Sequence, residues 1–215
     1  MPLIFYYGSG SPFAWKVWLT LEHKALPYEQ KLLSFDAGDL ARPEYLAVNP
    51  RGRVPAIVDD GFALWESSAI VEYLEERYPE RPVLPAELRA RARARRVAAE
   101  ADHYLYPAVR KLLALGLRGD ASGARRAAQV HAALQELGPE IARFVAALGD
   151  QPFFAGTLSV ADFACYPHLR MLRRLDERQP QHRAGRLLGP DLSAWMARVE
   201  ELPYFATTLP PHWKG

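Results

Sequence analysis

The chain has 215 residues, 49% of them hydrophobic and 24% charged, and a formal net charge of +2 at pH 7. The length allows one large or two small domains with an ample core. The small net charge excludes a field strong enough to indicate nucleic acid or an anionic membrane as a partner. The single cysteine, Cys165, excludes an internal disulfide and a Cys-x-x-Cys redox pair.

The sequence shows no targeting signal, because Met1 and Pro2 lead almost directly into an apolar run without a basic segment or a cleavage site. No apolar run reaches the length of a membrane span. Neither His103 nor His168 stands at metal-ligand spacing from another His or Cys. We therefore expect a cytoplasmic protein that binds no membrane and no metal.

The first predicted elements are a strand, a helix and a second strand. Leu3–Tyr7 is a short apolar and aromatic run that ends at a glycine-containing turn, which is typical of a buried strand. Ser11 is a favoured N-cap and Pro12 a favoured first helical residue, so a helix should run from here to about Lys24. Tyr28–Leu33 should form the second strand.

A loop over residues 35–42 and a short helix should precede the stretch Asn49–Pro55, which reads Asn-Pro-Arg-Gly-Arg-Val-Pro. An X-Pro amide keeps only about 0.5–1 kcal/mol of trans preference, so Pro55, at the opening of a strand, is a candidate for a cis bond. A cis bond would turn the backbone of Val54 outward, where its N–H and C=O could pair with an extended ligand as an added strand does. A trans proline that bounds the loop is the alternative.

A hairpin and a helix complete this half of the chain. Asp59-Asp60-Gly61 lies between the apolar runs 56–58 and 62–65 and predicts a β-hairpin. Glu66-Ser67-Ser68 then leads into residues 69–74, which are apolar at helical spacing. The pattern places two helix N-termini and one exposed strand close together.

The rest of the chain is predicted to be helical. Pro79, Pro82 and Pro85 break any helix and indicate a linker over residues 79–86. Ser159-Val160-Ala161-Asp162 has the form of a capping box, in which the serine caps an amide and the acidic residue reaches back. The expected helices are Glu87–Leu115, Ala124–Leu148, Val160–Leu175 and Leu192–Leu202, the first two separated by residues 116–123.

Three of these stretches together resemble a known family. Ser11-Pro12-Phe13, Asn49–Pro55 and Glu66-Ser67-Ser68-Ala69-Ile70 are similar to a cytosolic glutathione transferase of a bacterial, serine-type branch. The likeness covers nearly the whole chain and includes residues 159–162 in the helical half. It implies glutathione as the co-substrate.

The resemblance also implies a fold and an assembly. The fold would be an α+β, thioredoxin-like N-terminal domain of order βαβαββα, followed by an all-α helical-bundle domain. The implied boundaries are residues 1–78 for the glutathione-binding domain, 79–86 for a linker and 87–215 for the domain that binds the acceptor substrate. The protein would be a homodimer in which the first domain of one chain packs against the helices of the other.

Ser11 is the first candidate for the catalytic residue, because its hydroxyl at a helix start could donate to the glutathione thiolate. Ser9 in the same turn is an alternative, since either hydroxyl could be presented. Tyr7 is a third candidate, because the family also has tyrosine-type members. A simple N-cap role is the structural alternative for Ser11, and core packing is the alternative for Tyr7.

The resemblance assigns further residues to glutathione. The carboxylate of Glu66 suits the ligand ammonium group, and Ser67 at a helix start suits the α-carboxylate. Arg53 could pair with the glycyl carboxylate, and Val54 and Pro55 would present the main chain. Capping and a solvated loop charge are the alternatives for these side chains.

Asp102 resembles the acidic residue that some members extend towards the ligand of the partner subunit. An exposed, solvated carboxylate is the alternative reading of this position.

An apolar acceptor pocket is expected, because small-ligand sites are mostly apolar. For each aromatic candidate, core packing is the alternative. The pocket shape would depend on the segments 176–190 and 209–215. The candidate lining residues are Phe13, Trp15, Tyr104, Tyr106 and Tyr166.

The function implied is conjugation of glutathione to small electrophilic molecules, with a role in detoxification. Ser11 stands where redox-active relatives carry cysteine before the proline, which speaks against disulfide exchange. The turn lacks the cysteine-containing signature of the maleylacetoacetate isomerase branch, so a glutathione-dependent isomerase is a less favoured alternative. A non-catalytic glutathione-binding or interaction module with the same fold is another.

Overall fold

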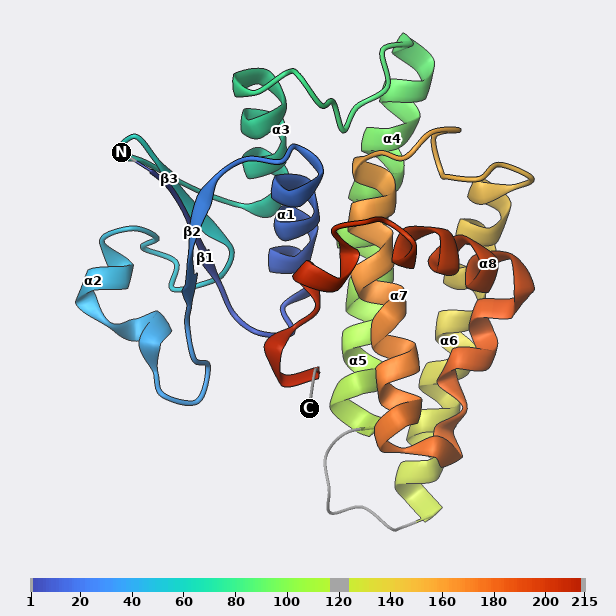
Figure 1. Cartoon of the computed structure of the whole chain (residues 1–215). Coiled ribbons are helices and arrows are strands. Elements are labelled where there is room, and N and C mark those ends of the chain that lie inside the picture. Colours follow the sequence, from blue (N-terminus) through green and yellow to red (C-terminus); the bar gives the residue numbers. More distant parts are fainter. Residues whose placement is uncertain (1, 117–123, 214–215) are drawn as a thin grey trace. The chain divides into compact units, whose positions relative to one another are not determined.

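The computed structural model describes residues 2–116 and 124–213, and its chain divides into two units (Figure 1). Unit 1 comprises Met1–Leu84 together with Leu202–Gly215, and unit 2 comprises Pro85–Glu201. The final segment of the chain is thus grouped with the first unit, although the boundaries predicted from the sequence put it with the helices. Most of the predicted break at residues 116–123 lies outside the described residues.

Unit 1 has the predicted order of strands and helices, βαβαββα. Two short 3₁₀ helices from the C-terminal segment join it. The elements are β1 (Leu3–Tyr7), α1 (Pro12–His23), β2 (Tyr28–Leu32), η1 (Asp39–Ala41), α2 (Pro43–Leu46), β3 (Ala56–Asp59), β4 (Phe62–Trp65), α3 (Ser67–Arg77), η5 (Phe205–Thr208) and η6 (Pro211–Trp213).

The four strands form one mixed sheet in the order β2-β1-β3-β4. β1 runs parallel to β2 and antiparallel to β3, and β3 and β4 form the predicted hairpin. In this register Tyr6 pairs with Ala56, and Ala56 pairs with Trp65. The C-terminal ends of β1 and β4 and the start of β3 therefore meet at one end of the sheet.

The side chains of β1 alternate between the two faces of this sheet, as a strand requires. The rings of Phe5 and Tyr7 lie 6.3 and 4.8 Å from the ring of Trp18 on α1. Tyr6 instead lies 5.6 Å from Tyr45 on α2. α1 and α3 thus cover one face of the sheet and α2 covers the other (Figure 1).

Unit 2 is all-helical among its described residues, as predicted. Its elements are α4 (Leu88–Glu100), the π-helix η2 (Ala101–Leu105), α5 (Tyr106–Gly116), α6 (Ala124–Leu148), α7 (Val160–Arg178), the 3₁₀ helices η3 (Pro180–His182) and η4 (Ala184–Leu188), and α8 (Gly189–Glu200).

Two predictions in this unit differ from the structure. The expected single helix Glu87–Leu115 is divided into α4, η2 and α5. Pro107 at the start of α5 has no backbone N–H to donate to the preceding turn, which accounts for the change of winding just before it. The expected loop 176–190 contains η3 and η4, and α8 begins at Gly189 rather than at Leu192.

The helix α7 forms the centre of unit 2, where it contacts α4, α5 and α8. The predicted capping box at its start is present. The Asp162 carboxylate accepts the backbone N–H of Ser159 at 2.9 Å. Trp195 of α8 and Phe154 are both fully buried, and their rings pack 5.0 Å apart.

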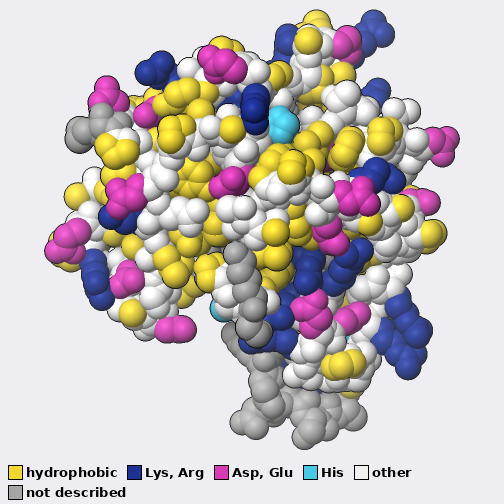
Figure 2. All heavy atoms as spheres, viewed as in Figure 1, with side chains coloured by type: hydrophobic (Ala, Val, Ile, Leu, Met, Phe, Trp, Pro, Cys, Tyr) yellow, Lys and Arg dark blue, Asp and Glu magenta, His cyan; other side chains and the backbone are white. Residues whose placement is uncertain are grey.

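The surface carries charges of both signs. On the face drawn in Figure 2, Asp and Glu side chains lie among Lys and Arg side chains, in keeping with the net charge of +2. Within residues 2–116 and 124–213, no helix combines the length and apolarity that crossing a bilayer requires.

Candidate functional site

The strand register brings the three sequence motifs of unit 1 together. The turn Ser9–Pro12 follows β1, the loop Asn49–Pro55 precedes β3, and Glu66-Ser67 follows β4. Because these three strand ends are neighbours, the motifs gather at one end of the sheet. The candidate site is built from this end of unit 1.

The first motif is a tight turn that starts α1. The backbone N–H of Ser11 donates to the carbonyl of Gly8 at 3.1 Å, which closes the turn. The Oγ of Ser11 accepts the backbone N–H of Ala14 at 3.3 Å, so Ser11 is the N-cap, and Pro12 is the first helical residue. Ser9 and Ser11 are both half-buried, so each residue is partly accessible to solvent.

Tyr7, the third catalytic candidate, lies in the core of unit 1. Its side chain is 5% exposed, and its ring stacks on Phe5 at a centroid distance of 5.4 Å. Burial raises the pKa of Tyr7 above its ordinary value, so the phenol stays protonated at neutral pH. These contacts favour packing as its role.

The second motif contains the predicted cis peptide bond, between Val54 and Pro55. The loop before it is fixed by hydrogen bonds to the Arg53 carbonyl, which accepts the Asn49 amide at 2.6 Å and the Tyr45 hydroxyl. Asn49 is 2% exposed, whereas the side chain of Arg53 is exposed and Val54 is half-buried. Buried side chains thus hold a loop in which the side chain of Arg53 is exposed and Val54 is partly accessible.

The third motif is the start of α3. Glu66 is exposed and has a left-handed backbone at φ +70°, a costly conformation for a residue with a side chain. Ser67, the first residue of α3, is 7% exposed. Strained backbone of this kind is concentrated at functional sites. The N–H groups at the start of a helix favour a negatively charged ligand group.

A buried cation lies beside this helix start. Lys16 of α1 is 1% exposed, and its ammonium group donates to the Oγ of Ser68 at 3.1 Å. The ammonium also lies 5.9 Å from the centre of the Phe13 ring. A positive charge here adds to the potential of the α3 N-terminus.

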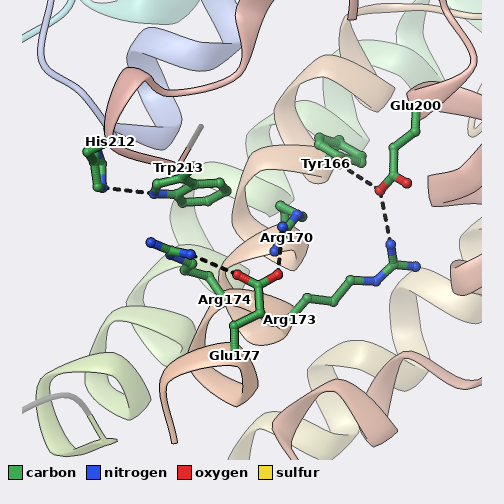
Figure 3. Close-up of polar contacts among 8 residues, drawn as sticks. All are labelled: Tyr166, Arg170, Arg173, Arg174, Glu177, Glu200, His212 and Trp213. Carbon is green, nitrogen blue, oxygen red and sulfur yellow. Dashed lines mark hydrogen bonds and ion pairs between the residues drawn. The ribbon is translucent and has the colours of Figure 1, made fainter. Parts of the chain in front are cut away.

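The C-terminal segment of unit 1 contacts the first motif. The Nδ1 of His212 lies 2.5 Å from the Oγ of Ser9, and the indole N–H of Trp213 donates to the Nε2 of His212 at 2.8 Å (Figure 3). The ring of Trp213 packs edge-on against Trp15 at 5.3 Å. The tail is therefore part of the candidate site.

Of the predicted acceptor residues in unit 1, Phe13 is half-buried and Trp15 is 2% exposed. The indole N–H of Trp15 donates to the Oγ1 of Thr208 at 2.9 Å. Trp15 therefore anchors the tail rather than lining an open surface, while Phe13 keeps an accessible edge.

The other acceptor candidates belong to unit 2. Tyr104 is 63% exposed, and Tyr106 packs 5.1 Å from the His168 ring. Tyr166 is fully buried and donates to Glu200 at 2.8 Å (Figure 3). Burial, followed by the nearby carboxylate, raises the pKa of Tyr166. Its surroundings favour core packing.

Asp102 also belongs to unit 2, on the π-helix η2. Its carboxylate lies 3.3 Å from the Nε2 of His168, and the two side chains are 10% and 2% exposed. The alternative of an exposed, solvated carboxylate at this position is thus wrong, because Asp102 is mostly buried against a histidine.

Sequence reasoning missed Lys16, Tyr45, His212 and Trp213. In the sequence Lys16 is one more charged residue on a predicted helix. His212 lies 203 residues from Ser9 along the chain. No local pattern links residues so far apart. The described residues contain no cluster of His, Cys, Asp or Glu that could hold a metal ion.

Two protein-family models match this chain. A model described as the glutathione S-transferase N-terminal domain matches residues 10–77, and a model described as the glutathione S-transferase C-terminal domain matches residues 97–203. Together they span most of the chain in the expected order.

Individual relatives agree with the family models. The chain is 44% identical over 110 residues to a maleylacetoacetate isomerase of Pseudomonas aeruginosa, a match that covers 50% of this chain and 51% of that protein. The chain thus spans about half the length of this curated relative.

Solved structures match the entire fold. A glutathione S-transferase of the Antarctic clam Laternula elliptica has a TM-score of 0.83 at 26% identity, over 100% of this chain and 94% of that one. A glutathione transferase of Burkholderia graminis, solved with two glutathione molecules per subunit, has a TM-score of 0.82 at 25% identity, over 100% and 90%. The predicted fold, a thioredoxin-like domain followed by a helical domain, is confirmed.

Proposed function

Because this chain belongs to the glutathione S-transferase family, we propose that it binds glutathione and joins the thiol sulfur to small electrophilic molecules. The observation that carries the proposal is the meeting of three motifs at one end of the sheet in unit 1. These are a serine at a helix start, the half-buried Val54 before the cis proline and a second helix start.

Ser11 is the proposed donor to the glutathione thiolate. Its Oγ accepts the N–H of Ala14, which uses an oxygen lone pair and not the hydroxyl hydrogen. The hydroxyl hydrogen can then point at the sulfur. A hydrogen bond to the charged form favours that form, as does the positive end of α1.

The remaining glutathione contacts follow from the chemistry of a tripeptide. The backbone of Val54, just before the cis proline, pairs with the extended main chain of the ligand. Ser67 at the start of α3 holds the γ-glutamyl carboxylate, and the exposed Glu66 pairs with its ammonium group. Arg53, whose side chain is exposed, reaches the glycyl carboxylate.

Ionisation of the thiol cannot be the whole mechanism. A thiol with the ordinary acidity of cysteine is only about 3% thiolate at pH 7. Making it a hundredfold more acidic raises that fraction about 24-fold but lowers the nucleophilicity of the sulfur roughly eightfold, a net gain near threefold. Holding the electrophile beside the sulfur must supply most of the acceleration.

The acceptor site and the assembly complete the proposal. Phe13 of unit 1 is half-buried and is the acceptor-contacting residue we favour. The enzyme is a cytoplasmic homodimer that needs no metal and acts in detoxification.

A second candidate function is a glutathione-dependent isomerisation. The observation that favours it is the 44% identity to a protein named maleylacetoacetate isomerase. In this reaction the thiolate adds to a double bond, the adduct rotates, and the thiolate leaves again. Glutathione is returned in an isomerase and consumed in a transferase.

The test uses the purified full chain with glutathione and two substrates, chlorodinitrobenzene and maleylacetoacetate. Conjugation with loss of one thiol per turnover supports the transferase. Isomerisation without loss of thiol supports the second candidate. A titration with glutathione alone completes the test. Binding of glutathione without turnover of maleylacetoacetate or of a broad panel of electrophiles indicates a binding module and contradicts both activities.

A further inference from the structure

The C-terminal tail forms a chain of hydrogen bonds that ends at the candidate site. Trp213 donates its indole N–H to the Nε2 of His212 at 2.8 Å, and the Nδ1 of His212 lies 2.5 Å from the Oγ of Ser9. The first of these contacts is drawn in Figure 3. All three residues belong to unit 1.

The chemistry of the indole decides which atom donates in each of these hydrogen bonds. An indole N–H can only donate, so the Nε2 of His212 must accept and carries no proton. The neutral imidazole then holds its proton on Nδ1. The contact with Ser9 is therefore a donation from the imidazole N–H to the serine oxygen.

This direction leaves the hydroxyl hydrogen of Ser9 for a different acceptor. The Oγ of Ser9 receives a hydrogen bond from His212, just as the Oγ of Ser11 receives one from the N–H of Ala14. Two serines in one turn thus have their oxygens occupied by donors of the protein. Each can direct its O–H outward to an anion.

Residues on both sides of the tail fit its position against this turn. Gly10 has φ +83°, and a Cβ at this position would come within 2.8 Å of the Cε1 of His212. Only glycine combines that backbone with room for the imidazole ring. On the other side the tail is fixed by Trp15, which donates to Thr208 at 2.9 Å and packs against Trp213.

We propose that Ser9 is a second hydroxyl donor to the sulfur of glutathione, acting together with Ser11, and that His212 of the C-terminal tail is the residue that positions it. The proposal depends on the glutathione chemistry proposed above. In this arrangement both serines donate to the sulfur, and the hydrogen bond from His212 orients the hydroxyl of Ser9.

The variants Ser9→Ala, His212→Leu and His212→Asn test this arrangement. The side-chain amide of Asn can donate from near the position of Nδ1, whereas Leu can donate nothing. We expect Ser9→Ala and His212→Leu each to lower kcat/KM for chlorodinitrobenzene about tenfold, the effect of ~1.4 kcal/mol. His212→Asn should restore most of the loss.

The double variant Ser9→Ala/His212→Leu separates positioning from a merely structural role. If His212 acts through Ser9, the double variant matches Ser9→Ala alone, because the second change removes nothing more. Multiplied losses, or wild-type activity in either single variant, would overturn the proposal. Thr207→Ala, an exposed change in the same tail, should match wild type.

A readout that needs no turnover is the ultraviolet absorbance of the thiolate in the complex with glutathione alone, at fixed pH. Ser9→Ala and His212→Leu should lower the thiolate fraction, and His212→Asn should not. An unchanged thiolate fraction in all variants would also overturn the proposal. A wild type that holds no thiolate and has no activity would instead overturn the proposed function.

Discussion

The Asp162 carboxylate of α7 accepts the indole N–H of Trp195 of α8 at 2.8 Å, with both side chains fully buried. The same carboxylate accepts the backbone N–H groups of Phe154 and Ser159 and the hydroxyl of Ser159. One side chain therefore joins the start of α7, the segment before it and α8. Removing it leaves several buried donors unsatisfied, which is costly.

We predict that Asp162→Asn lowers the free energy of unfolding by about 1–3 kcal/mol at pH 7, because the amide NH₂ group faces donors instead of accepting from them. Denaturant unfolding of wild type and variant measures this loss. Asp191→Asn is the control, since Asp191 is an exposed carboxylate on α8. Equal stability of wild type and Asp162→Asn would contradict the role given to this network.

The same residue predicts a pH dependence. Burial raises the pKa of Asp162 to about 6, against the hydrogen bonds that favour its charged form. Its pKa in the unfolded chain is lower, so between about pH 4 and 6 the folded state binds the proton more strongly. As the pH rises through this window, the free energy of unfolding of wild type should fall by up to ~3 kcal/mol relative to that of Asp162→Asn. A difference in stability between wild type and Asp162→Asn that stays constant from pH 4 to 7 would contradict the raised pKa of Asp162.

A separate prediction concerns Ser67 at the start of α3. Ser67→Ala removes a hydroxyl from the proposed carboxylate site and should raise the KM for glutathione about tenfold, the effect of ~1.4 kcal/mol. The kcat should change little, because the hydroxyl contacts the ligand far from the sulfur. Steady-state kinetics with varied glutathione measure this. Ser193→Ala on α8 is the control, and a KM equal to that of wild type in Ser67→Ala would remove Ser67 from the site.

Another prediction concerns the buried Lys16. Lys16→Met keeps the length of the side chain but removes the positive charge beside the start of α3. The affinity for glutathione should fall several-fold, because the ligand carboxylate loses a favourable potential. Calorimetric titration measures the change. Lys111→Met, at an exposed lysine paired with Glu136, should bind glutathione as wild type does.

A further prediction tests the proposed homodimer. Phe62 on the edge strand β4 is 52% exposed and lies 5.5 Å from the ring of Tyr73. If β4 lies in the subunit interface, Phe62→Ser should weaken the dimer at least about tenfold by loss of buried apolar area. Sedimentation velocity measures this. Leu32→Ser on β2, the opposite edge of the sheet, should leave the assembly unchanged, and a monomeric wild type would contradict the proposal.

The elements of unit 1 were predictable because their signals are local. Ser11 and Pro12 mark a helix start, and Asp60-Gly61 marks a hairpin, through conformational preferences that do not depend on the rest of the chain. The strands were placed by short apolar runs between such signals. The cis bond before Pro55 was predicted only as a candidate, since its stability depends on contacts in the folded state.

The parts that could not be predicted depend on contacts between distant residues. The helical period over residues 87–115 does not reveal the π-helix before Pro107, because the apolar pattern continues through it. The burial of Tyr166 and Asp102 depends on which faces of the helices pack together. The contact between His212 and Ser9 is set by the path of the tail, for which no periodic pattern exists.

The role of Ser11 is tested by the thiolate absorbance of bound glutathione, together with chlorodinitrobenzene turnover, in wild type and Ser11→Ala. Glu87→Ala is the matched control, because it removes the N-cap acceptor of α4, which accepts the N–H groups of Arg89 and Ala90. We predict that Ser11→Ala loses the thiolate signal and the turnover while it binds glutathione with nearly the affinity of wild type. Glu87→Ala should keep both. A Ser11→Ala variant with undiminished thiolate and turnover would show that Ser11 is not the donor to the sulfur.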